Sequence, residues 1–245
     1  MKVVGVDGCR GGWVAVVCTN GNYASAVYPN FIALMADHAD AARMYIDIPI
    51  GLPHAAMPRR LCDSLARKKL GARAASVFSP PCRAAVYADN YAHAMAINEA
   101  ELGMRFSIQA WGICKKIAEV DHYLRANPAV LPWLHEAHPE LAFWQLNAQN
   151  PLRENKKSAE GATQRTQLLE VVVPGIVGLM LPTLQSTRRA QLQPDDLWDA
   201  VALCLRAQMQ PSLAAPKQTP ATPMDAPLGH LEPPDACGLP MCIYY

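Results

Sequence analysis

The chain has 245 residues, of which 51% are hydrophobic and 18% are charged, and its formal net charge is +1. This length is enough for one large α/β domain or two small ones with a buried core, and we expect one domain over 1–245. The composition excludes an intrinsically disordered chain, and the near-neutral charge excludes a globally basic nucleic-acid-binding protein. Any contact with nucleic acid must therefore be local.

The sequence contains no segment typical of membrane insertion or secretion. The start, MKVVGVDG, has no apolar signal core, and the most apolar later stretch, 171–182, is roughly a dozen residues long, whereas a membrane span needs about 20. The eight cysteines form no CxxC pair, which argues against a zinc site and a thioredoxin-like motif. We expect a cytoplasmic protein with reduced thiols and no membrane partner.

The start of the chain predicts a sheet that begins with antiparallel strands. Three short apolar runs, separated by glycine-containing turns, predict a three-strand meander: 2–7, 13–19 and 23–28. Residues 31–42 have the spacing of a helix. The apolar run 44–48 follows that helix, so we expect it to join the sheet as a parallel strand.

A long, mostly helical stretch follows, and we interpret 52–128 as a helical insertion. Its predicted helices and proline-stiffened loop are 58–70, 91–103, 107–126 and the loop 77–83. A further strand, two helices and a proline-rich surface segment come next: 131–138, 158–172, 195–208 and 211–235. Residues 238–245 regain β character and are expected to form a strand or a clamp. The predicted fold class is α/β, with a mixed sheet flanked by helices.

Two aspartates are anomalous in their apolar runs. Asp7 ends the first predicted strand, and Asp47 lies near the end of the predicted parallel strand. A buried, unpaired carboxylate is costly, so such residues are normally paired, hydrogen-bonded, bound to metal or held at an exposed strand end. The carboxyl ends of adjacent strands are also where ligands collect in α/β sheets.

A second acidic group lies in the late helix PDDLWDAVAL. Asp196 and Asp199 are three residues apart and would share one helix face, whereas helix capping best explains Asp195. Carboxylates brought together repel one another unless a cation neutralises them. Mg²⁺ or Mn²⁺ is the natural partner, because hard oxygen ligands select such ions and a metal pair roughly 3.5–4 Å apart can drive phosphodiester cleavage.

A series of motifs in sequence order carries a resemblance to a known family: VVGVDGCRGGW, YIDIPIGLP, RRLCDSLARKKLG, SVFSPPCRAAVY, QAWGICKKIAEVD, EAHPELAFW, NKKSAEGATQR and DDLWDA. Through these motifs and the ending GLPMCIYY, nearly the whole chain resembles a domain-of-unknown-function family of predicted RNase H-like nucleases. The order of a strand aspartate, a second strand acid and a late helical aspartate pair also resembles Holliday-junction resolvases of the RNase H superfamily. The resemblance implies an RNase H-like fold and a metal-dependent nuclease.

Carried over by position, the resemblance implies four catalytic acids: Asp7, Asp47, Asp196 and Asp199. It implies that Asp7, Asp47 and Asp199 ligate the metal, with Glu140 as a further ligand. The family motif has a serine where this chain has Asn155, before two lysines of which Lys157 is a candidate substrate contact. Arg165, in the same motif, is either a phosphate contact or a solvated helix residue.

The EAHPE motif offers another possible ligand set. Glu136, His138 and Glu140 alternate, so on a strand they would share one face and could ligate metal. The alternative is that Pro139 ends the strand and His138 is a structural histidine. The sequence leaves both interpretations open.

Two features of the helical insertion could contact a substrate. In the loop 77–83, Cys82 and Arg83 could reach into the site, with Arg83 a candidate substrate contact, or both are structural. The chain has one concentrated basic stretch: Arg59, Arg60, Arg67, Lys68, Lys69 and Arg73. It could follow a phosphate backbone, or it is a solvated helix face.

The sequence therefore predicts a metal-dependent nuclease with nucleic acid as its partner, and it leaves two alternatives. One is an actin-like ATP-binding phosphotransferase, in which Gly8, Gly11 and Gly12 would form a phosphate-binding hairpin. The other is a non-catalytic nucleic-acid-binding or scaffold protein on the same fold.

Overall fold

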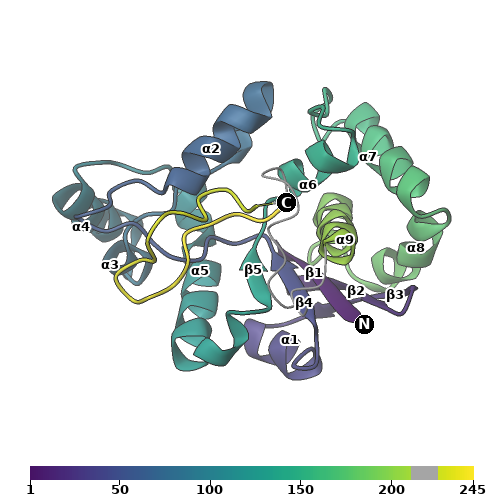
Figure 1. Ribbon diagram of the computed structural model, residues 1–245, viewed down its shortest axis with the longest axis horizontal. Coiled ribbons are helices and arrows are strands. Elements are labelled where there is room, and N and C mark those ends of the chain that lie inside the picture. Colours follow the sequence, from purple (N-terminus) through teal and green to yellow (C-terminus); the bar gives the residue numbers. More distant parts are fainter. Residues whose placement is uncertain (211–225) are drawn as a thin grey trace. The chain divides into compact units, whose positions relative to one another are not determined.

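The computed structural model describes residues 1–210 and 226–245 (Figure 1). The chain divides into two compact units, which we describe separately. The sheet unit comprises Met1–Asp47, Trp133–Ala226 and Tyr244–Tyr245, and the helical unit comprises Ile48–Pro132 and Pro227–Ile243. Most of the predicted proline-rich segment 211–235 lies outside the described residues, and the single domain with an insertion at 52–128 stays a prediction.

The sheet unit is built on a five-stranded mixed sheet in the order β3-β2-β1-β4-β5. Its strands are β1 (Lys2–Cys9), β2 (Gly12–Thr19), β3 (Asn22–Tyr28), β4 (Arg43–Ile46) and β5 (Leu134–Glu136). The first three pair antiparallel, whereas β4 pairs parallel with both β1 and β5. The predicted meander followed by parallel strands is therefore confirmed, and the fold is mixed α/β.

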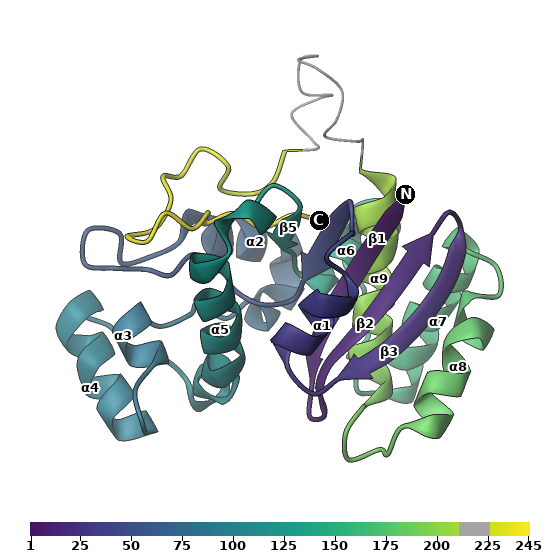
Figure 2. The same cartoon turned by 90° about the horizontal axis from the view of Figure 1, so that it is seen from below.

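Helices cover both faces of this sheet, as Figure 2 shows. They are α1 (Phe31–Asp37), α6 (Pro139–Leu146), α7 (Ala159–Val172), α8 (Ile176–Ser186) and α9 (Pro194–Met209). Helix α1 lies on one face, and α9 lies against β1, β2 and β4 on the other. Every residue of α9 from Leu197 to Ala207 is buried, which is typical of a central core helix.

Several predicted boundaries in the sheet unit were wrong. The helix predicted over 31–42 ends at Asp37, and the strand predicted over 131–138 is only Leu134–Glu136. The sequence pattern also missed α6 and α8. The apolar stretch 171–182 is divided, because Gly175 takes a positive φ of 85° and separates the end of α7 from α8.

The helical unit contains the remaining elements: α2 (Leu61–Leu70), η1 (Gly71–Ser76), α3 (Arg83–Val86), α4 (Tyr91–Leu102), α5 (Ile108–Ala126) and η2 (Pro128–Val130). Asn90 and Ser107 cap α4 and α5 through their side chains. The C-terminal segment folds back on itself through an antiparallel bridge between Leu228 and Ile243, and it joins the rest of this unit where the Leu52 N–H donates to Asp235 at 2.8 Å. The expected C-terminal β character is thus limited to single bridges.

Within residues 1–210 and 226–245, no helix combines the length and apolar character needed to cross a membrane.

Candidate functional site

Two aspartates meet near the carboxyl ends of β1 and β4. The parallel register places Val6 opposite Ile46, and the Asp47 backbone N–H donates to the Val6 carbonyl at 2.9 Å. Asp7 and Asp47 therefore lie side by side at the same end of the sheet, close enough for the charge of Asp47 to raise the pKa of Asp7. The chain passes through β2, β3 and α1 before β4 pairs parallel with β1, and parallel pairing brings the carboxyl ends of the two strands together.

Helix α9 brings a third carboxylate to this edge. A Cβ atom on Gly5 would lie 2.2 Å from the Ala200 carbonyl oxygen and the Cys204 nitrogen, so α9 rests directly on the backbone of β1. Gly5 and Asp7 face the same side of the strand, because side chains alternate along it. Asp199, next to Ala200, consequently faces Asp7, and only 2% of it is exposed. We call Asp7, Asp47 and Asp199 the carboxylate cluster.

One lysine reaches the carboxylate cluster from the segment before α7. The Lys156 ammonium lies 2.8 Å from Asp199 Oδ2 and 3.5 Å from Asp195 Oδ2. The backbone just before Lys156 passes very close to α7. A Cβ atom on Gly161 would lie only 1.8 Å from the Asn155 carbonyl oxygen, so glycine is needed at this position. Ser158 caps the helix at the same point by accepting from the Gly161 N–H. The chain therefore fixes Lys156 where its charge meets Asp199.

The pKa values of all three carboxyls lie above their ordinary range. Burial raises the pKa of Asp7 well above that range, and the charges of Asp47 and Asp199 raise it further. Burial raises the pKa of Asp47, while nearby positive charges only partly offset this. Burial also raises the pKa of Asp199 to about 6, although Lys156 acts in the opposite direction. The cluster is therefore short of positive charge.

The same two causes, burial and neighbouring charges, act on the pKa of Lys156 with the opposite signs. Burial alone would lower its pKa, but the charge and hydrogen bond of Asp199 outweigh burial and raise the pKa. Lys156 is thus a fixed cation, and it neutralises one of the three carboxylates. Two negative charges then remain when all three ionise, which equals the charge of one divalent cation.

The cluster fits a divalent cation by donor type and charge, although its side chains are not pre-arranged around one. Carboxylate oxygens are the hard ligands that Mg²⁺ and Mn²⁺ prefer. As positioned in residues 1–210 and 226–245, no group of three His, Cys, Asp or Glu side chains could hold one ion. Binding would therefore require rotation of at least one carboxylate, and Lys156 would have to share Asp199 with the ion.

Asp196 has a structural task beside the cluster. Its carboxylate accepts from the Gln193 N–H at 3.1 Å and closes a capping box at the start of α9. Its charge also raises the pKa of Asp7, although less than the other acids do. Asp195, for which the sequence favoured a role at the helix N-terminus, lies in the first turn of α9 and also pairs with Lys156. Asp196 and Asp199 therefore have different surroundings on one helix.

Glu140 lies on α6, so the strand that would carry Glu136, His138 and Glu140 on one face does not exist. His138 is the N-cap of α6, and its Nδ1 accepts from the Glu140 N–H at 3.2 Å. The interpretation in which Pro139 ends the strand is the correct one, because Pro139 begins the helix. The Glu140 charge still raises the pKa values of Asp47 and Asp199.

Arg165 forms an ion pair with Glu140 and lies over the Phe143 ring. Only 1% of Arg165 is exposed, so it is not a solvated helix residue. Its guanidinium compensates a buried acid, which is a role the sequence did not indicate. The Lys157 side chain is exposed, and its backbone N–H donates to Asn155 Oδ1 at 3.0 Å.

Arg83 belongs to the helical unit. Its guanidinium pairs with Asp121 at 2.9 Å and also with Asp235. Tyr87 donates to the same Asp121 at 2.8 Å. Arg83 is thus engaged by two buried carboxylates, and Cys82 is buried beside it.

Comparison with known proteins identifies a family but no characterised relative. No curated protein matches the chain, and no solved structure matches it. A family profile described as "Protein of unknown function (DUF429)" matches residues 5–224, which is most of the sequence. The chain therefore belongs to the DUF429 family of proteins of unknown function.

Proposed function

We propose that the sheet unit is an RNase H-like catalytic core and that the protein is a nuclease that hydrolyses phosphodiester bonds with Mg²⁺ or Mn²⁺. The observation that carries the proposal is the charge deficit of the carboxylate cluster: three acids with raised pKa values share the single ammonium of Lys156. Strong pKa shifts of this kind gather at functional sites. The arrangement of acids at two strand ends and on a helix packed against the sheet supports the RNase H-like assignment.

In this proposal each residue of the cluster has a distinct task. Asp7 and Asp47 would hold the ion from the sheet, and Asp199 would complete its ligands from α9. The bound ion would polarise a phosphoryl oxygen and lower the pKa of the attacking water. Lys156 would hold Asp199 in place, and its ammonium would attract the anionic phosphodiester to the cluster. Glu140, compensated by Arg165, would support the cluster electrostatically.

The glycine hairpin gives little support to the alternative of an actin-like ATP site. The Gly11 N–H, which would have to bind phosphate, already donates to the Gln191 carbonyl at 2.7 Å. A Cβ on Gly12 would lie 2.0 Å from the Tyr28 carbonyl oxygen, so close packing accounts for this glycine. The non-catalytic alternative is left to experiment.

The test is a cleavage screen on single-stranded, duplex, hybrid and branched substrates with Mg²⁺, with Mn²⁺ and with a chelator. We expect wild-type protein to cleave at least one substrate in a metal-dependent manner. Asp7→Asn and Asp199→Asn should each lower the rate at least ~100-fold, because each removes a ligand charge. The control Asp89→Asn removes an exposed aspartate of the helical unit and should leave the rate unchanged.

Two results would overturn the proposal. One is cleavage that persists in the chelator or in Asp7→Asn, since the cluster would then not be the catalytic site. The other is the absence of both metal binding in calorimetry and cleavage in the screen. That second result would favour the non-catalytic alternative.

A further inference from the structure

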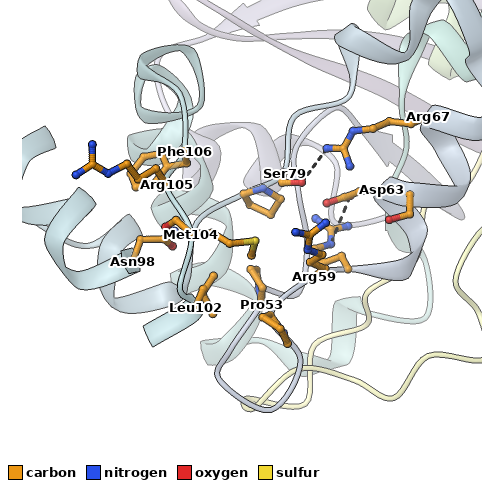
Figure 3. A pocket seen from close by; sticks show the side chains of 14 residues that line it. Pro53, Arg59, Asp63, Arg67, Ser79, Asn98, Leu102, Met104, Arg105 and Phe106 are labelled. Carbon is orange, nitrogen blue, oxygen red and sulfur yellow. Dashed lines mark hydrogen bonds and ion pairs between the residues drawn. The ribbon is translucent and has the colours of Figure 1, made fainter. Parts of the chain in front are cut away.

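The helical unit contains a cavity of about 210 Å³, formed by the start of α2, the loop before α3 and the connection between α4 and α5. Figure 3 shows that its two sides differ in character. Arg59, Asp63 and Arg67 lie on one side, and Leu102, Met104 and Phe106 lie on the other. We call it the basic cavity, because four arginines line it beside one carboxylate; the fourth, Arg105, lies beside Phe106.

The polar side holds two guanidiniums in fixed positions. Arg60 is only 2% exposed, its Nη2 contacts Cys62 Sγ at 3.1 Å, and its Nε lies 3.7 Å from Asp63 Oδ1. Arg67 donates through Nε and Nη2 to the Val77 carbonyl at 3.1 and 2.9 Å. Its Nη2 also donates to Ser79 Oγ at 2.8 Å. Guanidiniums held in this way lose little rotamer freedom when they bind an anion.

Arg59 adds an exposed guanidinium at the same side. Asp63 neutralises one of the four arginines, and Glu99 pairs with Arg105 at 3.3 Å, so two positive charges remain. A phosphomonoester carries about −1.5 to −2 charges near neutral pH, so it matches this excess. Arginine is also the side chain whose forked donors best match phosphate oxygens.

The apolar side makes the cavity suitable for more than an inorganic anion. Phe106 is half-buried and stacks edge-on against Tyr91 at a centroid distance of 5.7 Å. Asn98 fixes the connection that carries Phe106, because its Nδ2 donates to the Met104 carbonyl at 2.8 Å. Aromatic and thioether side chains offer contacts for the flat face of a nucleobase.

We propose that the basic cavity binds the phosphorylated end of a single-stranded nucleic acid, with the terminal phosphate at Arg59 and Arg67, the buried Arg60 adding its charge from behind them, and the terminal base against Phe106 and Met104. The choice of nucleic acid over other phosphorylated planar ligands rests on the proposed nuclease function. A cavity of about 210 Å³ limits the occupant to one nucleotide unit. The cavity therefore reads the chemistry of the strand end and not a base sequence.

The test measures binding without cleavage, using full-length Asp7→Asn protein in a chelator. The probes are short oligothymidylates with a fluorescent label, with either a 5′-phosphate or a 3′-phosphate, and their unphosphorylated counterparts. We expect one phosphorylated end to bind about tenfold more tightly than its unphosphorylated counterpart, because charge-assisted contacts to the dianion are added. Thymidine monophosphate should displace the probe at a lower concentration than inorganic phosphate does.

Matched variants assign this preference to the cavity. Arg59→Ala and Arg67→Lys should each reduce the preference for the phosphorylated end to less than about threefold. Lys68→Ala removes the same charge from an exposed position of α2 outside the cavity lining, and it should preserve the preference. Phe106→Leu should weaken binding of thymidine monophosphate but not of inorganic phosphate, whereas Phe78→Leu, outside the lining, should change neither.

Three results would overturn the inference: equal affinity for both ends, an equal loss in Lys68→Ala and Arg59→Ala, or inorganic phosphate that competes as well as the nucleotide. Failure here is distinguishable from failure of the proposed function. Cleavage that is unaffected by Arg59→Ala, together with no phosphate preference, removes the strand-end site and leaves the nuclease. Cavity-dependent binding without any cleavage retains the site and removes the nuclease.

Discussion

Buried carboxylates occur in both units, but their surroundings differ. In the helical unit, Asp121 and Asp235 face the guanidinium of Arg83, and Asp235 also accepts backbone N–H groups from Leu52 and Leu239. Burial would raise the pKa of Asp235, but these hydrogen bonds outweigh burial and lower it. In the carboxylate cluster, burial and like charges raise every pKa. The protein compensates the first group of acids, whereas it compensates the carboxylate cluster only in part, through Lys156.

This difference separates a structural role from a binding role. A compensated buried acid contributes to folding through its partners, and its removal leaves those partners buried without their charge. An uncompensated group costs stability in the folded protein and gains it back when a ligand supplies the missing charge. In the basic cavity the uncompensated charge is positive, so an anionic ligand would supply the missing charge. Experiments that change the compensation in each region should therefore have opposite effects.

Removing the arginine from the compensated region should have the largest effect. Arg83→Met leaves Asp121 and Asp235 without their shared partner, so we expect a loss of about 3–5 kcal/mol in the free energy of unfolding. Arg125→Met is the control, because Arg125 contacts Asp121 from a more exposed position and should change stability little. Urea denaturation monitored by circular dichroism measures both. A loss in Arg125→Met as large as that in Arg83→Met would contradict the assignment.

Adding a divalent cation should stabilise the uncompensated region. At a free Mn²⁺ concentration 100 times its dissociation constant, linkage predicts a gain of about 2.7 kcal/mol. We expect the melting temperature of wild-type protein to rise with Mn²⁺ and that of Asp7→Asn to rise much less. Asp89→Asn should respond like wild type. The same rise in Asp7→Asn as in wild type would mean that the ion binds elsewhere.

Neutralising one acid of the cluster should stabilise the metal-free protein in a pH-dependent way. The folded pKa of Asp7 is raised, so the folded protein holds this proton more firmly than the unfolded chain does. Stability is therefore lost as pH rises through the raised pKa values, of which that of Asp199 is about 6. Asp7→Asn resembles the protonated form and avoids this loss.

We expect Asp7→Asn to be more stable than wild type by about 1–2 kcal/mol at pH 8 in a chelator, the scale on which single changes usually act. The difference should vanish near pH 4, where the wild-type carboxyls also carry protons. Thermal denaturation across this pH range tests the expectation. A difference that does not depend on pH would indicate a packing effect instead of relief of charge.

The pairing of Asp7 with Asp47 was predictable from sequence, because an apolar run after a helix was expected to join the sheet as a parallel strand and each of the two runs carries an acid near its carboxyl end. The position of α6 was also encoded, since Pro139 is favoured at the first turn of a helix. The two-residue alternation of Glu136, His138 and Glu140 obscured it. A proline can end a strand and begin a helix at the same position. The alternation of residue types at every second position does not reveal such a change of secondary structure.

Other features could not be predicted from local pattern. Which of two adjacent lysines reaches Asp199 depends on how closely the chain passes over Gly161. The pairing of Arg83 with Asp235 joins residues 152 positions apart. The burial of Arg165 against Glu140 likewise depends on the packing of α7 beside α6. These contacts are set by tertiary structure, and residue type and spacing carry no signal for them.

Lys156 tests whether the cluster's own cation competes with an added one. Replacing it by methionine keeps the length and apolar stem of the side chain and removes the charge nearest Asp199. The cluster then has three negative charges available to the ion instead of two, so we expect Mn²⁺ to bind about tenfold more tightly, equivalent to ~1.4 kcal/mol. Lys157→Met is the matched control, because its side chain is exposed and should leave the affinity unchanged. Calorimetric titration measures both at pH 8, which lies above the Asp199 pKa of about 6. Weaker binding in Lys156→Met would show that Lys156 orients Asp199 for the ion and does not compete with it. In that case cleavage should fall together with affinity, whereas in the competitive case cleavage could fall while affinity rises, because the positive charge that attracts the phosphodiester is lost.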